Sequence, residues 1–292
     1  MAPAGPEAPA LRAAVIGSPI GHSKSPLLHA AAYRAIGVDC SYTAVDVDEA
    51  GLAAFIAGVR ATPAWRGLSV TMPLKAAAAR LVDTTTAPAS VLGVINTVVV
   101  TGEGRGRVLT GHNTDVVGVA HALAGAGVRT PGHPVVLGGG GTAAAALAGL
   151  AQLGARTAAV LVRRPEASAE LLRVGADLGL DVVIGPWSGA GEAVRAADVV
   201  VSTLPPRAAD PLAADLAGPG FRTHGTLLDV AYDPWPSALA AAWQGAGGSI
   251  VPGLDMLLHQ AVEQVRLFFP DVTQDPAGVL DVMCDAVGAA RR

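Results

Sequence analysis

The sequence has few aromatic residues, few charged residues and no long apolar run. Aromatic residues make up 4% of its 292 residues, which argues against a surface that stacks nucleobases. The formal net charge of −4 gives no electrostatic reason to expect nucleic acid or an anionic membrane as a partner. No apolar run reaches the roughly 18 residues of a spanning helix, so we expect no membrane segment.

Cysteine is also scarce, with only Cys40 and Cys284 in the chain. Neither cysteine has the spacing of a metal ligand, so the sequence predicts no metal site. Two isolated thiols fit a reducing compartment, and a disulfide between them stays open as an alternative. The first eleven residues lack the basic and apolar regions of a signal peptide. We therefore expect a cytoplasmic protein.

The length of 292 residues and the hydrophobic fraction of 51% favour two domains with buried cores. Short β-rich runs alternate with helical patterns along the chain, which is typical of α/β domains with mostly parallel sheets. The helices are expected at 27–36, 49–59, 115–125, 143–151, 167–178, 236–245, 256–269 and 276–290. The strands are expected at 13–16, 41–45, 68–70, 95–100, 108–110, 134–137, 158–162, 199–202, 227–230 and 249–251.

Two of these strands, 95–100 and 108–110, flank a turn-like glycine segment and predict a hairpin. The pattern restarts after Pro131, with a strand, a glycine run and a long alanine-rich helix. We place the domain boundary in the helix that begins near Asp115 and the return crossing near Gly253. One domain then comprises 1–114 and 253–292, and the other comprises 115–252.

The glycine run follows the strand 134–137 and precedes the alanine-rich helix. In this strand–loop–helix context, Gly138 permits a tight turn, Gly140 lets the backbone approach a pyrophosphate, and Ala143 allows close packing. The start of the helix offers N–H groups and a positive dipole end to phosphates. The expected coenzyme-binding residues of the loop are Gly138, Gly139, Gly140, Gly141 and Thr142.

The end of the next strand indicates which dinucleotide binds. An NAD site usually has an acidic residue about 20 residues after the glycines, whereas this chain has Arg163 and Arg164. Two guanidinium groups can bind the 2′-phosphate of NADP. The alternative is a solvated pair of surface arginines. NADP is the predicted cofactor.

Two serines lie between the first strand and the first helix, in the segment Gly21-His22-Ser23-Lys24-Ser25-Pro26. Ser23 and Ser25 are two residues apart, so in an extended loop they face the same side and can donate to a carboxylate. The alternative is that Ser25 caps the helix, with Pro26 at its first position. Both roles are compatible if Ser25 caps the helix and Ser23 stays available to a ligand.

Lys75 follows a strand and a rigid turn, and Lys24 is the only other lysine in the chain. Lysine, unlike arginine, can lose its proton when partly desolvated, which acid–base chemistry needs. In isolation, a lysine at a helix start is more often solvated. Asp115 at a helix start is more often a cap, and His112 has no partner at metal-ligand spacing.

Six blocks in this order resemble the shikimate dehydrogenase family over residues 13–269. They are Gly-Ser-Pro-Ile-Gly-His-Ser-Lys-Ser-Pro at 17–26, Val-Thr-Met-Pro-Leu-Lys at 70–75, Gly-Val-Ile-Asn-Thr at 93–97, Asn-Thr-Asp at 113–115, the glycine run at 138–143, and Gly-Leu-Asp-Met-Leu-Leu-His-Gln at 253–260. Any one block is common elsewhere, but the ordered set is specific to the family.

The resemblance implies a substrate domain and a Rossmann-type NADP domain, with the active site in the cleft between them. It also implies reversible reduction of 3-dehydroshikimate to shikimate, a step of aromatic amino-acid (chorismate) biosynthesis, by a monomer or homodimer. The residues with implied roles lie in the matched blocks and in the segment 229–232. The resemblance implies that Lys75 and Asp115 are the catalytic pair and that Ser23, Ser25 and Tyr232 bind the substrate carboxylate. It also implies that Thr71, Asn96 and Gln260 bind the substrate ring and that Val230 and Gly253 lie near the nicotinamide.

The sequence departs from the family pattern at four places. Ser69 stands where the family usually has Asn, His112 where it has Asp, and Val116 where it has Gly. The Asn-Arg-Thr of many members is Arg163-Arg164-Pro165 here, which changes the region expected to recognise the adenine ribose. None of these departures removes a proposed catalytic group.

Three other functions compete with this interpretation. A quinate/shikimate dehydrogenase that uses NAD is the nearest, and the two arginines argue against it. An enzyme like methylenetetrahydrofolate dehydrogenase has a comparable two-domain layout, but the serine pair and Gln260 fit it poorly. A non-catalytic NADP-binding regulator would be indicated by loss of Lys75 or Asp115, and both are present.

Overall fold

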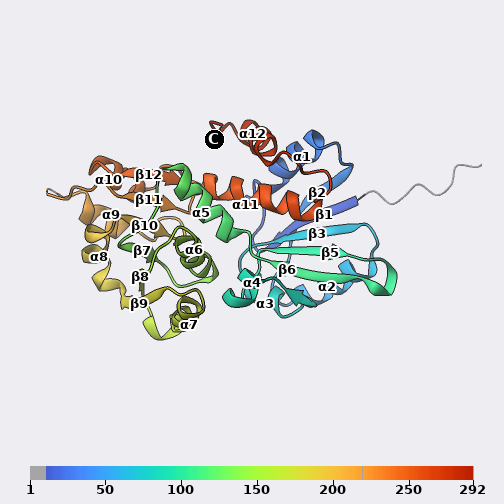
Figure 1. The fold of residues 1–292 in the computed structure, drawn as a ribbon, viewed down its shortest axis with the longest axis horizontal. Helices are drawn as coiled ribbons and strands as arrows, with labels where there is room; N and C mark the ends of the chain where they lie inside the picture. The colour runs from blue at the N-terminus through green and yellow to red at the C-terminus, as the bar shows by residue number, and fades with distance from the viewer. Residues whose placement is uncertain (1–10, 219, 292) are drawn as a thin grey trace, which may run out of the picture. The chain divides into compact units, whose positions relative to one another are not determined.

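Each of the two parts of the chain is built on a six-stranded sheet, as a computed structural model that describes residues 11–218 and 220–291 shows (Figure 1). Unit 1 ends at Thr114 and resumes at Ala261, and unit 2 runs from Asp115 to Gln260. The second crossing therefore lies inside a helix, α11 (Gly253–Phe268), rather than at its start.

The sheet of unit 1 has the strand order β2-β1-β3-β5-β6-β4. The bounds are β1 (Leu11–Gly17), β2 (Cys40–Asp46), β3 (Trp65–Val70), β4 (Thr84–Thr85), β5 (Thr97–Thr101) and β6 (Val108–His112). Strand β5 runs antiparallel to both β3 and β6, and the other pairs are parallel. The expected hairpin between β5 and β6 is confirmed.

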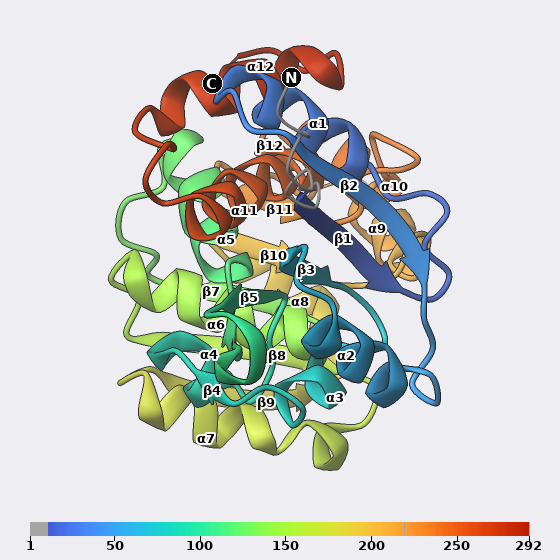
Figure 2. The same ribbon diagram turned by 90° about the vertical axis from the view of Figure 1, so that its right-hand side faces the viewer.

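Helices cover both faces of this sheet. On one face lie α2 (Leu52–Ala61), α3 (Lys75–Ala79) and α4 (Ala87–Leu92), which share an apolar core with the strands. Helix α2 faces this core because Leu52, Ile56 and Val59 repeat at helical spacing, and all three are at most 3% exposed. On the other side, α1 (Ser25–Ala35) lies beside α12 (Pro276–Ala286), as Figure 1 and Figure 2 show.

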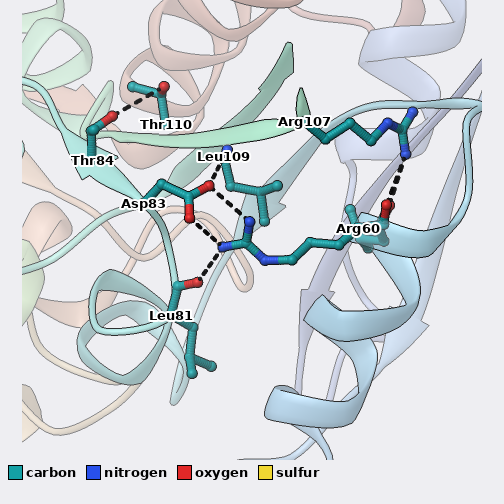
Figure 3. Close-up of polar contacts among 8 residues, drawn as sticks. Arg60, Leu81, Asp83, Thr84, Arg107, Leu109 and Thr110 are labelled. Carbon is teal, nitrogen blue, oxygen red and sulfur yellow. Dashed lines mark hydrogen bonds and ion pairs between the residues drawn. The ribbon is translucent and has the colours of Figure 1, made fainter. Parts of the chain in front are cut away.

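An ion pair ties α2 to the far edge of the same sheet (Figure 3). Both terminal nitrogens of Arg60 donate to the Asp83 carboxylate, at 2.8 and 2.9 Å. Asp83 also accepts the backbone N–H of Leu109 in β6, at 2.7 Å. These contacts hold the pKa of Asp83 below its usual value, through the Arg60 hydrogen bonds first. The segment 81–83 is thereby fixed between α2 and β6.

Unit 2 has a wholly parallel sheet of order β12-β11-β10-β7-β8-β9. The strands are β7 (Pro134–Leu137), β8 (Thr157–Val162), β9 (Asp181–Pro186), β10 (Val199–Ser202), β11 (Thr226–Asp229) and β12 (Ser249–Pro252). Read from β9, this is the doubly wound order of a dinucleotide-binding fold, which reverses direction between β7 and β10.

Two layers of helices enclose this sheet (Figure 1). One layer comprises α5 (Asp115–Gly125), α6 (Gly141–Gln152) and α7 (Glu170–Asp177). The other comprises α8 (Ala190–Ala196), α9 (Asp210–Leu216) and α10 (Ala238–Gly245), whose apolar side chains share a core with β7, β10 and β11. The predicted α/β class with mostly parallel sheets is confirmed.

The described residues also bear on the expectations about cysteines and membranes. Cys40 is partly exposed and Cys284 is buried, and neither forms a disulfide. Among helices within 11–218 and 220–291, none has the length and apolar character that crossing a bilayer requires.

Candidate active site

In unit 1, the loops that follow β1 and β3 lie side by side at the carboxyl ends of the strands, because these strands are parallel neighbours. This end of the sheet is called its edge below. The N–H of Thr71 donates to the carbonyl of Ile16 at 2.9 Å, and the N–H of Ser18 donates to the carbonyl of Met72 at 3.1 Å. Only glycine fits at position 17, since a Cβ there would lie 2.4 Å from the Thr71 methyl carbon. The serine-bearing loop and the Thr71–Lys75 segment are thus joined at this edge.

Ser23 and Ser25 occupy the end of the first of these loops. Ser23 is partly exposed and its hydroxyl accepts the N–H of Ser25 at 3.3 Å. The prediction that Ser25 caps the helix is wrong. Lys24 already has helical backbone angles and its carbonyl accepts from Leu27 and Leu28, so Ser25 lies inside the first turn and no side chain caps α1. Ser25 is buried, at 6% exposure.

Lys75 is the first residue of α3, directly after the turn that begins at Thr71. Its side chain is partly buried. Its backbone carbonyl accepts the N–H of Ile95 at 3.2 Å, which brings the start of α3 next to the segment that carries Asn96. The only other lysine, Lys24, is the N-cap residue of α1. The structure therefore brings Lys75, Thr71 and Asn96 to the same edge of unit 1.

Asn96 precedes β5 and is almost fully buried, at 3% exposure. Its Oδ1 accepts the N–H of Thr114 at 2.7 Å, and its Nδ2 donates to the Thr114 hydroxyl at 2.8 Å. Asn113 donates from its Nδ2 to the carbonyl of Val94 at 3.0 Å. The side-chain amides of Asn96 and Asn113 therefore link the residues just before β5 to the segment that follows β6.

In unit 2, the glycine run lies where the sheet order reverses, after β7. Gly138 has φ of +110°, and a Cβ there would lie 2.5 Å from the Thr203 hydroxyl, so glycine is required. A Cβ on Gly139 would lie 2.2 Å from the hydroxyl of Ser168. The loop is thus packed against its neighbours up to this point.

Gly140 differs from these two glycines. Its φ of −91° and ψ of −170° suit any residue, and a Cβ there would meet nothing within 4 Å. Neither backbone conformation nor internal packing requires glycine at this position. The backbone at the start of α6 is therefore open at Gly140, beside the N–H groups with which a helix begins.

Arg163 and Arg164 follow β8, the parallel neighbour of β7, and Leu161 pairs with Leu137 at the strand ends. Both arginines are exposed. They therefore stand at the same edge of the sheet as the glycine run, without an acidic side chain beside them in sequence until Glu166. This arrangement suits a phosphate-bearing ribose on the loop.

Val230 and Gly253 lie together at the ends of β11 and β12. A Cβ on Gly253 would lie 2.2 Å from the carbonyl oxygen of Val230, so the two backbones are in contact. Next to them, Asp229 accepts from Ser237 at 2.6 Å, and its pKa is raised, mainly by burial. Tyr232 is partly exposed, and burial raises its pKa too.

Asp115 and Gln260 belong to neighbouring helices of unit 2. Asp115 begins α5 and is 5% exposed, and Gln260 lies in α11 and is 6% exposed. One turn after Asp115, a Cβ on Gly118 would lie 2.7 Å from the carbonyl oxygen of Met256 and 3.1 Å from the Cβ of Gln260. Close helix packing therefore places the first turn of α5 against α11.

No side-chain group of three or more metal-ligating residues occurs within the part of the chain that the structure describes. Gln264, one turn beyond Gln260 in α11, was not among the candidate residues, although it is 1% exposed. The sequence signal that could have found it is the pair of glutamines four residues apart on one helix face.

Comparison with known proteins shows the family of this chain. The family described as the shikimate dehydrogenase substrate binding domain matches residues 15–98. A shikimate dehydrogenase (NADP(+)) of Methylobacterium radiotolerans is 39% identical over 278 residues, which cover 90% of this chain and 94% of that protein. The chain belongs to the shikimate dehydrogenase family. The resemblance of the six sequence blocks is thereby confirmed.

Solved structures agree with this membership. The crystal structure of Mycobacterium tuberculosis shikimate dehydrogenase is 41% identical, with a TM-score of 0.83, and the match covers 96% of this chain and all of that one. A Thermus thermophilus shikimate 5-dehydrogenase, solved in complex with NADP(H) and shikimate, is 30% identical with a TM-score of 0.77, over 94% of this chain and 99% of that one. The alternative of an enzyme like methylenetetrahydrofolate dehydrogenase is set aside by these matches.

Proposed function

We propose that this chain catalyses the reversible, NADPH-dependent reduction of 3-dehydroshikimate to shikimate, an oxidoreductase reaction on a secondary alcohol. The observation that carries the proposal is the joint presence of two sites in a member of this family. Thr71, Lys75 and Asn96 meet at one sheet edge, and a glycine loop with an unexplained Gly140 starts α6. Spectrophotometric detection of NADPH formed from shikimate and NADP tests it.

We assign substrate binding to unit 1. Ser23 and Ser25 are assigned to the carboxylate of the substrate, since Ser23 lies at the end of the loop that follows β1 and Ser25 begins α1 directly after it. Thr71 and Asn96 are assigned to ring hydroxyls by the family resemblance, and the backbone bonds between Thr71 and Ile16 and between Val70 and Asn96 place both residues beside the loops of β1 and β3. Tyr232 and Gln260, on unit 2, are assigned to the carboxylate and to the ring.

We assign NADP binding to unit 2, with the pyrophosphate at Gly138–Thr142 and the 2′-phosphate at Arg163 and Arg164. Val230 and Gly253, whose backbones are in contact at the ends of β11 and β12, are assigned to the nicotinamide by the family resemblance. The bound NADPH supplies the hydride. The chain's own groups hold the coenzyme through backbone N–H donors at the start of α6 and through the two guanidinium groups.

Hydride addition to the carbonyl carbon builds negative charge on the substrate oxygen. Lys75, as an ammonium, donates the proton to that oxygen, and Asp115 orients the lysine and the adjacent substrate hydroxyl. In the reverse direction the neutral lysine accepts the proton from shikimate. Because both groups are present, a non-catalytic regulator is disfavoured, and the paired arginines disfavour the NAD-dependent quinate enzyme. Oligomeric state and cellular location stay predictions.

Replacing Ser23 with alanine is expected to raise KM for shikimate about tenfold, since a hydrogen bond to a charged group contributes about 1.5–3 kcal/mol. The thermal midpoint should change little, because Ser23 accepts only one long hydrogen bond, at 3.3 Å. Steady-state kinetics and thermal unfolding measure the two effects. Ser90→Ala, an exposed serine of α4, is the matched control. An unaltered KM in Ser23→Ala would move the carboxylate site elsewhere.

A further inference from the structure

A buried polar network in unit 1 lies beside the residues assigned to the substrate. At its centre is Gln264 of α11, whose Oε1 accepts the Ser69 hydroxyl at 2.7 Å and lies 3.2 Å from Nε2 of His29. Its Nε2 donates to the Thr97 hydroxyl at 2.9 Å and to the backbone carbonyl of Asn96 at 3.3 Å. Of these residues, only Asn96 has a role in the proposed reaction.

The orientation of the Gln264 amide is fixed by chemistry. The backbone carbonyl of Asn96 can only accept a hydrogen bond, so the amide nitrogen must face it and the amide oxygen must face Ser69 and His29. Nε2 of His29 therefore carries the proton, and its Nδ1 accepts the Tyr33 hydroxyl at 3.2 Å. Burial lowers the pKa of His29 to about 3, so the ring is neutral and keeps this single tautomer.

The backbone N–H of Thr114 determines the orientation of the Asn96 side-chain amide, at the other end of the network. The backbone N–H of Thr114 can only donate, so the atom of Asn96 that faces it at 2.7 Å must be Oδ1. The hydroxyl of Thr97 accepts from Gln264 and therefore turns its one proton to Oδ1 of Asn96, at 2.8 Å. Along the path from Gln264 through the Thr97 hydroxyl to the Asn96 side-chain amide, each hydrogen bond therefore has only one possible donor and one possible acceptor.

A second branch from the same amide leads towards the serine loop. The Tyr42 hydroxyl donates to Ser69 at 2.6 Å, and Ser69 donates to Gln264. Burial raises the pKa of Tyr42, and hydrogen bonding by Ser69 and by Ser25 opposes that rise. Gln264 therefore stands between Asn96 and Ser25, two residues assigned to different groups of the substrate.

We propose that Gln264 is a positioning residue for substrate binding, which acts through Thr97 to hold the Asn96 amide in one orientation. The inference rests on the proposed role of Asn96 at the ring hydroxyls. Without the hydroxyl of Thr97, Oδ1 loses one of the donors that keep it turned inward. The Thr114 N–H still keeps Oδ1 on the inner side, but the amide is held less tightly, and its Nδ2 meets the substrate in a less fixed geometry. Coenzyme binding does not depend on this network, because all of its members lie in unit 1.

The sharpest test compares two substitutions at position 97. Thr97→Val keeps the shape but removes the hydroxyl, and it should raise KM for shikimate about three- to tenfold, the effect of one buried hydrogen bond. Thr97→Ser keeps the hydroxyl and should recover most of that loss. KM for NADP should stay at the wild-type value in both variants. Thr273→Val is the matched control, because it also deletes a buried hydroxyl of unit 1, one that donates to the Phe269 carbonyl at 2.8 Å.

Gln264→Met provides the second arm, since methionine has a similar length and no hydrogen-bonding amide. Combined with Thr97→Val, it should raise KM no further than the larger single effect, because both changes break one path. Thermal unfolding of each variant measures the loss of stability separately. Should Gln264→Met not fold, the comparison at position 97 decides alone.

The outcomes are distinguishable. A raised KM for shikimate in Thr97→Val, recovered in Thr97→Ser and absent in Thr273→Val, supports the proposal. Equal KM values in Thr97→Val and Thr97→Ser, or a rise in Thr273→Val that matches the one in Thr97→Val, would overturn it, since the network would then serve stability alone. Lack of shikimate turnover by the wild-type protein would instead refute the proposed function on which the inference depends.

Discussion

Replacing Lys75 with alanine is expected to lower kcat about 10²–10⁴-fold, the usual contribution of a general acid or base. KM should change little, because the ammonium acts mainly in the transition state, when charge develops on the substrate oxygen. Lys75→Arg should not restore activity, since a guanidinium keeps its charge but gives up a proton poorly. Asp115→Asn should impair both kcat and KM, because Asp115 is assigned to both the lysine and the substrate.

The control for this series is Arg80→Ala, which removes an exposed cation at the other end of α3. Circular dichroism and thermal unfolding establish that each variant is folded, and steady-state kinetics then give kcat and KM. Near-normal kcat in either variant of position 75 would show that water or another side chain carries the proton. A comparable loss in Arg80→Ala would attribute the effect to the helix rather than to the lysine.

Replacing both Arg163 and Arg164 with alanine is expected to weaken NADP binding about 10²-fold while NAD binding stays nearly unchanged. Each hydrogen bond between a guanidinium and a phosphate contributes about 1.5–3 kcal/mol, and we take the lower end because both side chains are exposed. NAD has no 2′-phosphate, so it loses no such contact. Binding of each dinucleotide, measured by calorimetry, gives the ratio directly.

Arg195→Ala is the matched control for the arginine pair. It removes an exposed arginine of the same unit that pairs with Asp215 at 3.1 Å, on α8 and away from the glycine run in sequence. Its NADP-to-NAD preference should equal that of the wild type. The assignment of the 2′-phosphate fails if the double variant also keeps the wild-type preference.

Elements with a strong local signal were predicted closely. Strand β7 and strand β10 have the bounds expected for them, because each is a short, fully buried apolar run between polar or turn residues. Helix α5 runs over Asp115–Gly125 as expected, since an acidic start and a glycine end flank its apolar repeat. Gly138 also has the positive φ that a tight turn after a strand requires.

Short elements were missed. Strand β9 (Asp181–Pro186) has only three consecutive apolar residues and ends in Gly185 and Pro186, and it pairs with β8 alone because it is an edge strand. Helix α8 (Ala190–Ala196) and helix α9 (Asp210–Leu216) are too short to repeat an apolar face more than once. Tertiary contacts, not local pattern, fix such elements.

The residues of the candidate site also fall into those that local sequence could place and those that it could not. The placement of motif residues such as Thr71, Lys75 and Asn96 could be predicted, because Thr71 and Lys75 follow β3 and Asn96 precedes β5, its antiparallel neighbour; their roles stay predictions. The network around Gln264 could not, because it joins residues from 29 to 264 that only the fold brings together. The capping role of Ser25 was wrong because the helix starts one residue earlier than proline at its first position implies.

The most direct test of the account is the rate of reduced-coenzyme formation by the wild-type protein, with shikimate and quinate each offered with NADP and NAD. The account predicts that kcat/KM is highest for shikimate with NADP, because we assign the 2′-phosphate of the coenzyme to Arg163 and Arg164 and infer shikimate as the substrate from the family. Highest kcat/KM for quinate with NAD would contradict it. NADP binding without turnover of either acid would contradict it as well, and would identify a regulator rather than an enzyme.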